Sequence, residues 1–347
     1  MAVTQNETAR YSLKIAGTEY TQSDPKGLES LVVEDGLDII GKCDATFSGQ
    51  SGTTWSSIKS GDDVEVTFGG STFKVFKGVV TSLRHGFQHG RDTLTVTAMD
   101  PLAKLAASRQ TSSDFKDMTD SDVVNKVMGG AEVEIGLVDA TPETRQYHLQ
   151  RNESALEILR RYAARNPAYI VRANEGKVDF CKLQLSDPPI EIPINQLMSL
   201  DYNQSPRGLP ESMAVRGWDY LTKSMVEGKA TASDLQAIGG GTIAPSSAPI
   251  WKAGETAYIT DQWVDTQQSA KDAATAQFFW TALQFLRGKA VVQGNGSLHA
   301  GVRVKFANHQ SGFNPDAVVM SSRHRVFVGS GFTTEIVFAS NTYADGG

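Results

Sequence analysis

Two stretches far apart in the chain share one pattern of apolar and polar residues. Residues 64–68 read Val-Glu-Val-Thr-Phe and residues 302–306 read Val-Arg-Val-Lys-Phe, an alternation that predicts β-strands with one buried face. In both copies an apolar pair and an Arg-His pair follow, at 79–85 and 318–324. The copies lie about 240 residues apart, whereas solenoid repeats recur every ~20–50 residues. The pattern therefore predicts an internal duplication into two related β domains.

Helical spacing replaces this alternation between the two β regions. Residues 119–122 (Thr-x-x-Asp) and 154–157 (Ser-x-x-Glu) carry capping-box signatures, and each is followed by apolar residues at helical intervals. We therefore expect helices over 119–130 and 154–166, the second of which ends because Pro167 cannot continue it. A hairpin is expected to follow over 169–180.

The remaining elements complete the expected architecture. A third helix is predicted from about Gln268 to Leu286, and the Gly/Ser/Ala/Thr-rich residues 230–248 before it are expected to be a flexible loop. Together the elements predict an α+β, mainly β fold with two similar antiparallel, tube-like β-barrels and a small α/β module between them. The expected parts are a first barrel over 1–105, the module over 106–188, and a second barrel over 189–347 that contains the loop and helix at about 226–288.

The composition is that of an ordinary globular protein. The 347 residues are 40% hydrophobic and 21% charged, and the net charge of -6 provides no basic field for a phosphate backbone. We therefore expect no nucleic-acid binding. The chain starts without the apolar segment of a secretory signal, and no stretch approaches the ~20 apolar residues that span a bilayer. Synthesis in a cytoplasm and the absence of a membrane segment are therefore expected.

Motifs for metals, redox chemistry and disulfides are missing from the sequence. The six histidines do not have metal-ligand spacing. Cys43 and Cys181 do not have CxxC spacing, and we expect both to be buried, free thiols. His85 and His324 recur with the duplication, each after an arginine, and we favour a role at a strand end or an interface over ligand binding.

Two further motifs have simple structural interpretations. Asp62-Asp63 is read as part of a turn rather than a catalytic acid/base pair, because adjacent residues on a strand point to opposite faces. Gly294-x-Gly296 lacks the third glycine of a dinucleotide-binding loop and follows no βαβ pattern. The sequence therefore predicts no catalytic, cofactor-binding or metal-binding residue.

Several segments, taken in their order and spacing, nevertheless resemble a known family. They are residues 94–102 (LTVTAMDPL), 115–122 (FKDMTDSD) and 150–159 (QRNESALEIL), with further matches at 215–223 (VRGWDYLTK) and at His324 followed by 331–334 (GFTT). They resemble the phage late control protein D family. That family includes the baseplate hubs of contractile phage tails, R-type pyocins and extracellular contractile injection systems, and the N-terminal part of the type VI valine-glycine repeat spike proteins. The resemblance covers roughly Tyr11 to Tyr343.

The resemblance implies a structural protein rather than an enzyme. In the family, two similar barrels per subunit and three subunits per ring give six near-equivalent positions, which join a hexameric inner tube to a trimeric spike. The implied partners are two further copies of this chain, an inner tube protein, a spike, other baseplate proteins and cargo in the lumen, within a phage tail or injection particle. Because the chain stops at residues 341–347 without a needle domain, the spike is expected to be a separate polypeptide.

Two other interpretations remain open from sequence alone. The β-rich character and the residues Trp55, Trp218 and Trp251 would also suit a carbohydrate-binding or cell-wall-degrading tail component. Binding to a glycan array, or loss of turbidity on cell-wall material, would distinguish that component from a structural hub. An enzyme with a dispersed site is the remaining alternative.

Overall fold

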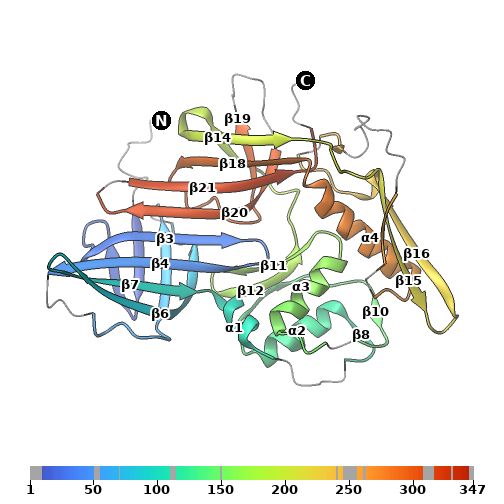
Figure 1. The fold of residues 1–347 in the computed structure, drawn as a ribbon, viewed down its shortest axis with the longest axis horizontal. Helices are drawn as coiled ribbons and strands as arrows, with labels where there is room; N and C mark the ends of the chain where they lie inside the picture. Colours follow the sequence, from blue (N-terminus) through green and yellow to red (C-terminus); the bar gives the residue numbers. More distant parts are fainter. Residues whose placement is uncertain are drawn as a thin grey trace.

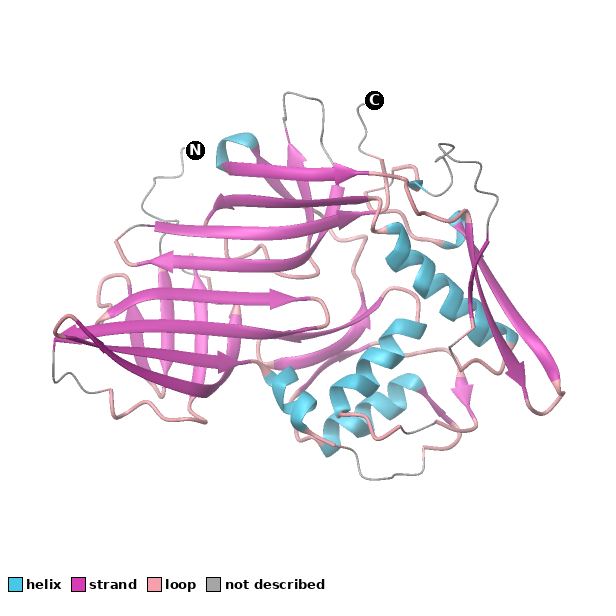
Figure 2. Ribbon diagram, in the orientation of Figure 1, coloured by secondary structure: helices cyan, strands magenta, loops and turns pink. Residues whose placement is uncertain are grey.

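Strands dominate the computed structural model of this chain (Figure 2). The structure describes residues 10–50, 55–69, 71–109, 115–148, 151–239, 241–244, 256–260, 263–307, 316–329 and 331–343. The mainly β fold predicted from the sequence is confirmed. No helix of the described ranges is both long enough and apolar enough to cross a membrane.

A single 13-stranded sheet passes through both predicted barrels. Its strands curl into a half-barrel, with β14 at the top and β6 at the lower left of Figure 1. In spatial order the strands of its main path are β14 (Leu197–Gln204), β18 (Leu286–Gln293), β21 (Gly331–Ser340), β20 (Asp316–Phe327), β3 (Leu28–Gly36), β4 (Ile39–Gln50), β7 (Arg91–Met99), β6 (Phe76–Gln88), β5 (Asp63–Phe68), β1 (Tyr11–Ile15) and β2 (Thr18–Thr21). Off this path, β13 (Ile190–Pro193) pairs with β19 (Arg303–Ala307), which pairs with β20.

The duplication is visible in the register of the strands. The order β3-β4-β7-β6 corresponds to β14-β18-β21-β20, and both units contain the same irregularities. A bulge interrupts β6 between Val80 and Ser82 and β20 between Val319 and Ser321. A second bulge lies in the Leu-x-Ser-Leu segments 28–31 of β3 and 197–200 of β14. Because bulges are specific features of a fold rather than random defects, their recurrence argues that the two units are copies.

Each unit packs its own hydrophobic core against the same face of the sheet. Phe47, Val66 and Leu94 belong to the core of the first unit, and Phe306 and Phe338 belong to that of the second. The units differ at their outer strands, since β1 pairs antiparallel with β5 whereas β13 pairs parallel with β19. The residue limits of the predicted domains stay a prediction, because one continuous sheet joins the two units.

The α/β module lies at the end of the half-barrel where β7 finishes (Figure 1). The two helices predicted here are confirmed as α2 (Asp120–Gly130) and α3 (Ala155–Arg165), and both begin with the predicted capping box. The predicted hairpin is formed by β11 (Tyr169–Asn174) and β12 (Lys177–Lys182). The module also contains α1 (Pro101–Ala107), β8 (Met118–Thr119), β9 (Ile135–Val138) and β10 (Thr144–Arg145).

A second module is inserted between β14 and β18. It consists of β15 (Ser212–Asp219), β16 (Ser224–Thr231), the short 3-10 turn η2 (Ala232–Asp234), β17 (Thr256–Ile259) and α4 (Gln267–Ala282). A second 3-10 turn, η1 (Ile194–Gln196), lies outside this module and joins β13 to β14. The strands β15 and β16 form a long hairpin that extends away from the half-barrel (Figure 1).

Two expectations about the predicted loop and helix at about 226–288 were wrong. The predicted loop of residues 230–248 starts too early, because Ala230 and Thr231 belong to β16, and residues 240 and 245–248 of that loop lie outside the described residues. Small residues serve packing on β16: a Cβ at Gly228 would lie 2.0 Å from the backbone nitrogen of Lys271 in α4. The helix ends at Ala282 rather than at Leu286, because Leu286 begins β18 and is buried in the core of the second unit.

Candidate interaction surfaces

The junction between the two units is an antiparallel strand pair. β20 pairs with β3 from Ser321 opposite Gly36 to Phe327 opposite Ser30. On the face away from the cores, Arg323 Nε lies 2.6 Å from Glu34 Oε1 across the pair. The pairing of β20 with β3 therefore shows, within one chain, how the edge strand of one unit joins the first strand of another.

The buried side of this junction is polar. Ser322 Oγ donates to Asp35 and lies 3.1 Å from His324 Nε2, while His324 Nδ1 lies 3.0 Å from Thr334 Oγ1. The backbone N–H of Ala300 donates to the other oxygen of Asp35 at 2.8 Å. Burial lowers the pKa of His324 to about 3 and raises the pKa of Asp35. The imidazole at the centre of the junction is therefore neutral, and its two ring nitrogens are both within hydrogen-bond reach of hydroxyls.

His324 makes the stability of the junction sensitive to acid. The unfolded imidazole takes up a proton near pH ~6.5, whereas the folded one remains neutral down to about pH 3, so its contribution is lost as the pH falls through this range. Between about pH 6.5 and 5, we expect the native protein to lose about 2 kcal/mol of unfolding free energy that His324→Gln does not lose. Urea denaturation across this pH range measures the difference. Equal slopes for the native protein and His324→Gln would contradict this assignment.

The corresponding edge of the first unit has no strand beside it. β5 pairs with β6 only over residues 76–79, and within the described part of the chain no strand covers residues 82–88 on that side. His85, the counterpart of the buried His324, is exposed. The strand β14, the counterpart of β3, pairs only with β18 among the described strands, and Met198 on β14 is 63% exposed. The half-barrel thus ends in two complementary edges, which correspond to the two strands already joined at its centre.

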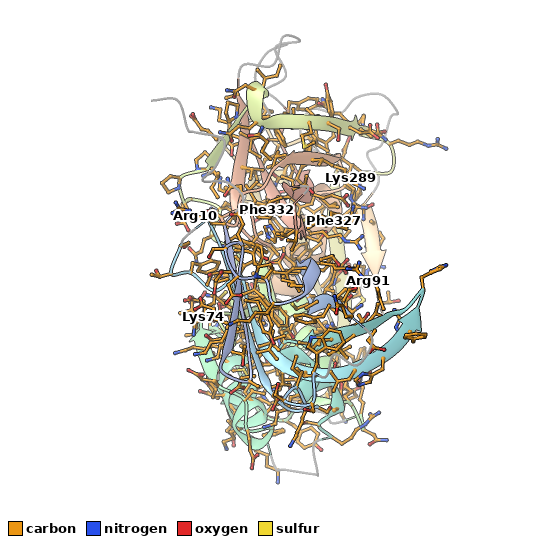
Figure 3. The ribbon with its side chains drawn as sticks, turned by 90° about the vertical axis from the view of Figure 1, so that its left-hand side faces the viewer. Arg10, Lys74, Arg91, Lys289, Phe327 and Phe332 are labelled. Carbon is orange, nitrogen blue, oxygen red and sulfur yellow. The ribbon has the colours of Figure 1, made fainter. Side chains whose placement is uncertain are left out.

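The two ends of the half-barrel differ in symmetry. At one end, the hairpins β6–β7 and β20–β21 occupy equivalent positions. Each has an exposed phenylalanine near its turn, Phe87 (66% exposed) and Phe327 (53% exposed), although the two are one residue out of register between the copies. Figure 3 shows this end toward the viewer, with Phe327 near the middle of the view. At the opposite end, the module with α1 to α3 and the module with α4 have different folds. Each unit therefore contributes a β-hairpin at the hairpin end, whereas each of the two modules at the opposite end occurs once per chain.

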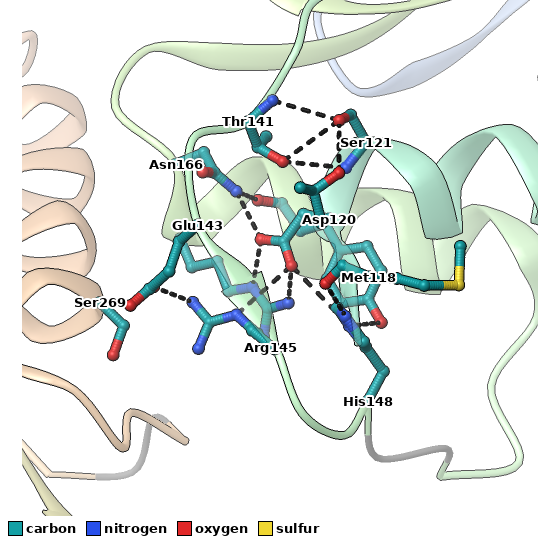
Figure 4. Close-up of polar contacts among 12 residues, drawn as sticks. Met118, Asp120, Ser121, Thr141, Glu143, Arg145, His148, Asn166 and Ser269 are labelled. Carbon is teal, nitrogen blue, oxygen red and sulfur yellow. Dashed lines mark hydrogen bonds and ion pairs between the residues drawn. The ribbon is translucent and has the colours of Figure 1, made fainter. Parts of the chain in front are cut away.

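A buried ionic cluster stabilises the module end (Figure 4). Asp120, at the start of α2, contacts Arg165 of α3, accepts a 2.8 Å hydrogen bond from Asn166 Nδ2, and lies 3.4 Å from Arg145 Nε. His148 Nδ1 lies 3.8 Å from the same carboxylate. Burial alone would raise the pKa of Asp120, but the two guanidinium groups and the amide of Asn166 lower it. The carboxylate is therefore held ionised between its partners.

The same cluster connects the two modules. Arg145 Nη1 lies 3.4 Å from Asp265 Oδ1, just before α4, and Thr266 at the N-terminus of α4 donates to Glu143. Gln277 Nε2 of α4 donates to the carbonyl of Ala164 in α3 at 3.2 Å. The α/β module and the α4 module are thus held together by side chains that come from segments far apart in the sequence.

The face of the half-barrel opposite the cores, here called the concave face, carries charges of both signs. In Figure 3 the sheet curves toward the right, where Lys289 and Arg91 are labelled. Lys42–Asp44 and Lys289–Glu335 are ion pairs at 2.6 and 3.0 Å. Basic residues predominate along the strands of this face, with Lys42, Arg84, Arg287, Lys289, Arg323 and Arg325 against Glu34, Asp44, Asp201 and Glu335.

The aspartate pair and the two cysteines discussed in the sequence analysis have structural roles. Asp62 Oδ2 accepts from the Lys59 backbone N–H at 2.6 Å, in the turn that was expected. Cys43 and Cys181 are buried free thiols. No group of three or more His, Cys, Asp or Glu side chains in the described ranges could hold a metal ion.

The three tryptophans weighed for glycan binding have separate positions. Trp55 packs against the first core, with its ring 6.3 Å from that of Phe47. Trp218 is exposed on β15, and Trp251 lies outside the described residues. They form no shared aromatic surface in the part of the chain that the structure describes.

The comparisons with known proteins identify the family and the fold. The family model described as the Alg8 N-terminal domain matches residues 48–327. The chain belongs to this family. The family description names a domain and states no activity or partner. No curated protein sequence matches the chain.

Solved structures share the fold over nearly the whole chain. The tail protein from Neisseria meningitidis MC58 matches at 15% identity and a TM-score of 0.73, covering 96% of each chain. The 43 kDa tail protein of prophage MuSo2 from Shewanella oneidensis matches at 15% identity and a TM-score of 0.73, covering 96% of this chain and 98% of the other. The E. coli c3393 protein, described as a type VI secretion component similar to T4 tail proteins gp27 and gp5, matches at 13% identity and a TM-score of 0.61, covering 96% and 77%. The chain thus has the fold of these tail proteins over nearly its whole length.

Proposed function

We propose that this chain is the structural baseplate hub of a contractile injection machine or phage tail, of the late control protein D type. Three copies form a pseudo-sixfold ring that joins a hexameric inner tube to a separate trimeric spike, with other baseplate proteins around it. The hub has no enzymatic role. It is made in the bacterial cytoplasm and assembled into the particle.

One observation carries this proposal. The half-barrel has two open strand edges, on β6 and β14, and the equivalent strands β20 and β3 pair with each other at its centre. β20 joins β3 within the chain, so β6 of one copy is expected to join β14 of the next by the same register. Such pairing covers strand edges that would otherwise favour aggregation. Since each chain supplies two equivalent units, three copies supply six.

The difference in symmetry between the two ends supports this choice of partners. Only the hairpin end presents equivalent features from both units, so it suits a sixfold tube. The module end presents each module once per chain, so it suits a threefold spike. Force from the tube would then reach the spike along the strands.

The inferred register can be tested by a covalent link between copies. Arg323 lies opposite Glu34 within the chain, and the equivalent residues at the open edges are Arg84 and Asn203, both exposed. Directly opposed strand residues are close enough for a disulfide. With Arg84→Cys and Asn203→Cys in one chain, we expect oxidation to give linked dimers and then a closed trimer of three times 37.5 kDa, about 112 kDa. Denaturing gels and native mass measurement identify these species.

The matched control moves one cysteine along the strand. Ser199 is also exposed on β14 but lies four residues from Asn203, so Arg84→Cys with Ser199→Cys should give little covalent trimer. Equal linking by both pairs would refute the register. A ladder that continues beyond three copies would refute the closed ring.

A further inference from the structure

A cavity of about 540 Å³ lies between the two units, on the side of the sheet away from the concave face. Its walls come from the end of β5 and the following loop, and from the loop after β18. Arg10 and Lys74, which neighbour its lining segments, lie on the left of Figure 3, opposite Lys289 and Arg91. The volume falls within the ~300–1,000 Å³ typical of small-ligand sites.

The Gly294-x-Gly296 motif builds one wall of this cavity. A Cβ at Gly294 would lie 1.9 Å from the ring of Phe332, and a Cβ at Gly296 would lie 2.9 Å from Phe68. The two rings stack on each other with centroids 4.5 Å apart. The two glycines therefore let the loop backbone lie directly against the rings of Phe332 and Phe68. This close packing, rather than nucleotide binding, explains the Gly294-x-Gly296 motif.

The chemistry of the lining is neutral, aromatic and rich in amides. None of the side chains that line the cavity belongs to Asp, Glu, Lys or Arg. Burial lowers the pKa of His299, which stacks on Phe73 with centroids 5.0 Å apart, so this ring is uncharged as well. Among the described residues, the amides of Gln196 and Gln293 have no side-chain hydrogen bond, and both line the cavity. Ser71, Ser297 and Asn295 add further polar groups.

We propose that this cavity binds a short, neutral oligosaccharide. Phe68 and Phe332 are only 2% and 8% exposed and stack on each other, so they form the floor of the cavity. The half-buried rings of Phe73 and His299 offer the aromatic surface for the apolar C–H face of a sugar ring. The exposed amides of Gln196 and Gln293 can both donate to and accept from the sugar hydroxyls. The absence of ionised lining groups disfavours nucleotides, phosphates and acidic sugars. The site is separate from the open edges of β6 and β14, so a closed ring leaves it facing outward. This proposal does not depend on the hub function.

Calorimetric titration of the full chain with chitotriose and with maltotriose tests the proposal. We expect at least one of these neutral sugars to bind with a dissociation constant between micromolar and millimolar, and a galacturonic acid trimer to bind no more tightly. Gln293→Ala should weaken binding about fivefold by removing a hydrogen-bonding amide. Ser297→Trp, at the exposed rim of the cavity, should abolish binding by filling it.

Gln22→Ala removes an exposed amide elsewhere and should bind as the native chain does. Circular dichroism shows whether each variant is folded. Absence of binding by both sugars at millimolar concentration, equal binding by the native chain and a folded Ser297→Trp variant, or tighter binding of the acidic trimer would each overturn the proposal.

Discussion

Replacing Asp120 by alanine is expected to lower the free energy of unfolding by about 3–5 kcal/mol, because the change leaves two guanidinium groups buried without their shared carboxylate. Arg145 and Arg165 are 7% and 11% exposed, so water cannot replace the lost partner. Urea denaturation of Asp120→Ala beside the native chain measures the loss.

A surface ion pair in the same module provides the control. Glu134 and Lys177 lie 3.0 Å apart with both side chains about half exposed, and Glu134→Ala should leave the free energy of unfolding nearly unchanged because water replaces the lost partner. If Asp120→Ala and Glu134→Ala lower the free energy of unfolding by the same amount, the cluster in Figure 4 does not stabilise the module end.

Replacing His85 by proline is expected to prevent ring formation while leaving the chain folded. β6 and β7 meet at a two-residue turn, His89-Gly90, with φ of 51° and 77°. In such a turn the backbones of Gln88 and Arg91 hydrogen-bond to each other. Hydrogen-bonded pairs alternate with non-hydrogen-bonded pairs along the two strands, so His85 is in a non-hydrogen-bonded pair and its backbone N–H points away from β7, toward the open edge. Proline has no N–H and is tolerated on edge strands. Native mass measurement should therefore find the monomer of 37.5 kDa where the native chain gives trimers.

The variant His85→Gln keeps the backbone donor at the same position and should still assemble. If assembly needs the tube or the spike, the comparison is made with those partners present. Normal ring formation by a folded His85→Pro variant would exclude β6 as the joining edge.

Local signals in the sequence were sufficient to predict α2, α3 and the duplication. The capping boxes at Thr119 and Ser154 fixed the starts of α2 and α3, because the groups that satisfy the first backbone N–H groups lie within one turn. The alternation at 64–68 and 302–306 likewise marked β5 and β19. These features depend on residues that are close in the chain.

Features that depend on distant residues had no such signal. The continuous sheet requires β20 to meet β3, nearly the full length of the chain apart, and edge pairing leaves no mark in the pattern of either strand. The ionic cluster joins Asp120, Arg145, Arg165 and Asp265, none of which is distinctive in its local context. The exposed His85 and the buried His324 look alike in sequence, and only the presence of β3 beside one of them separates their roles.

The direction of the strands has a mechanical consequence. In Figure 1 the strands of the half-barrel run from the hairpin end toward the module end, so the bonds that join neighbouring strands lie across that direction. A thrust along the strands would load all the bonds of one joint together, in shear, instead of opening them one after another like a zipper. The weakest route to rupture under such a thrust would then be tilting of whole subunits rather than peeling of their edges.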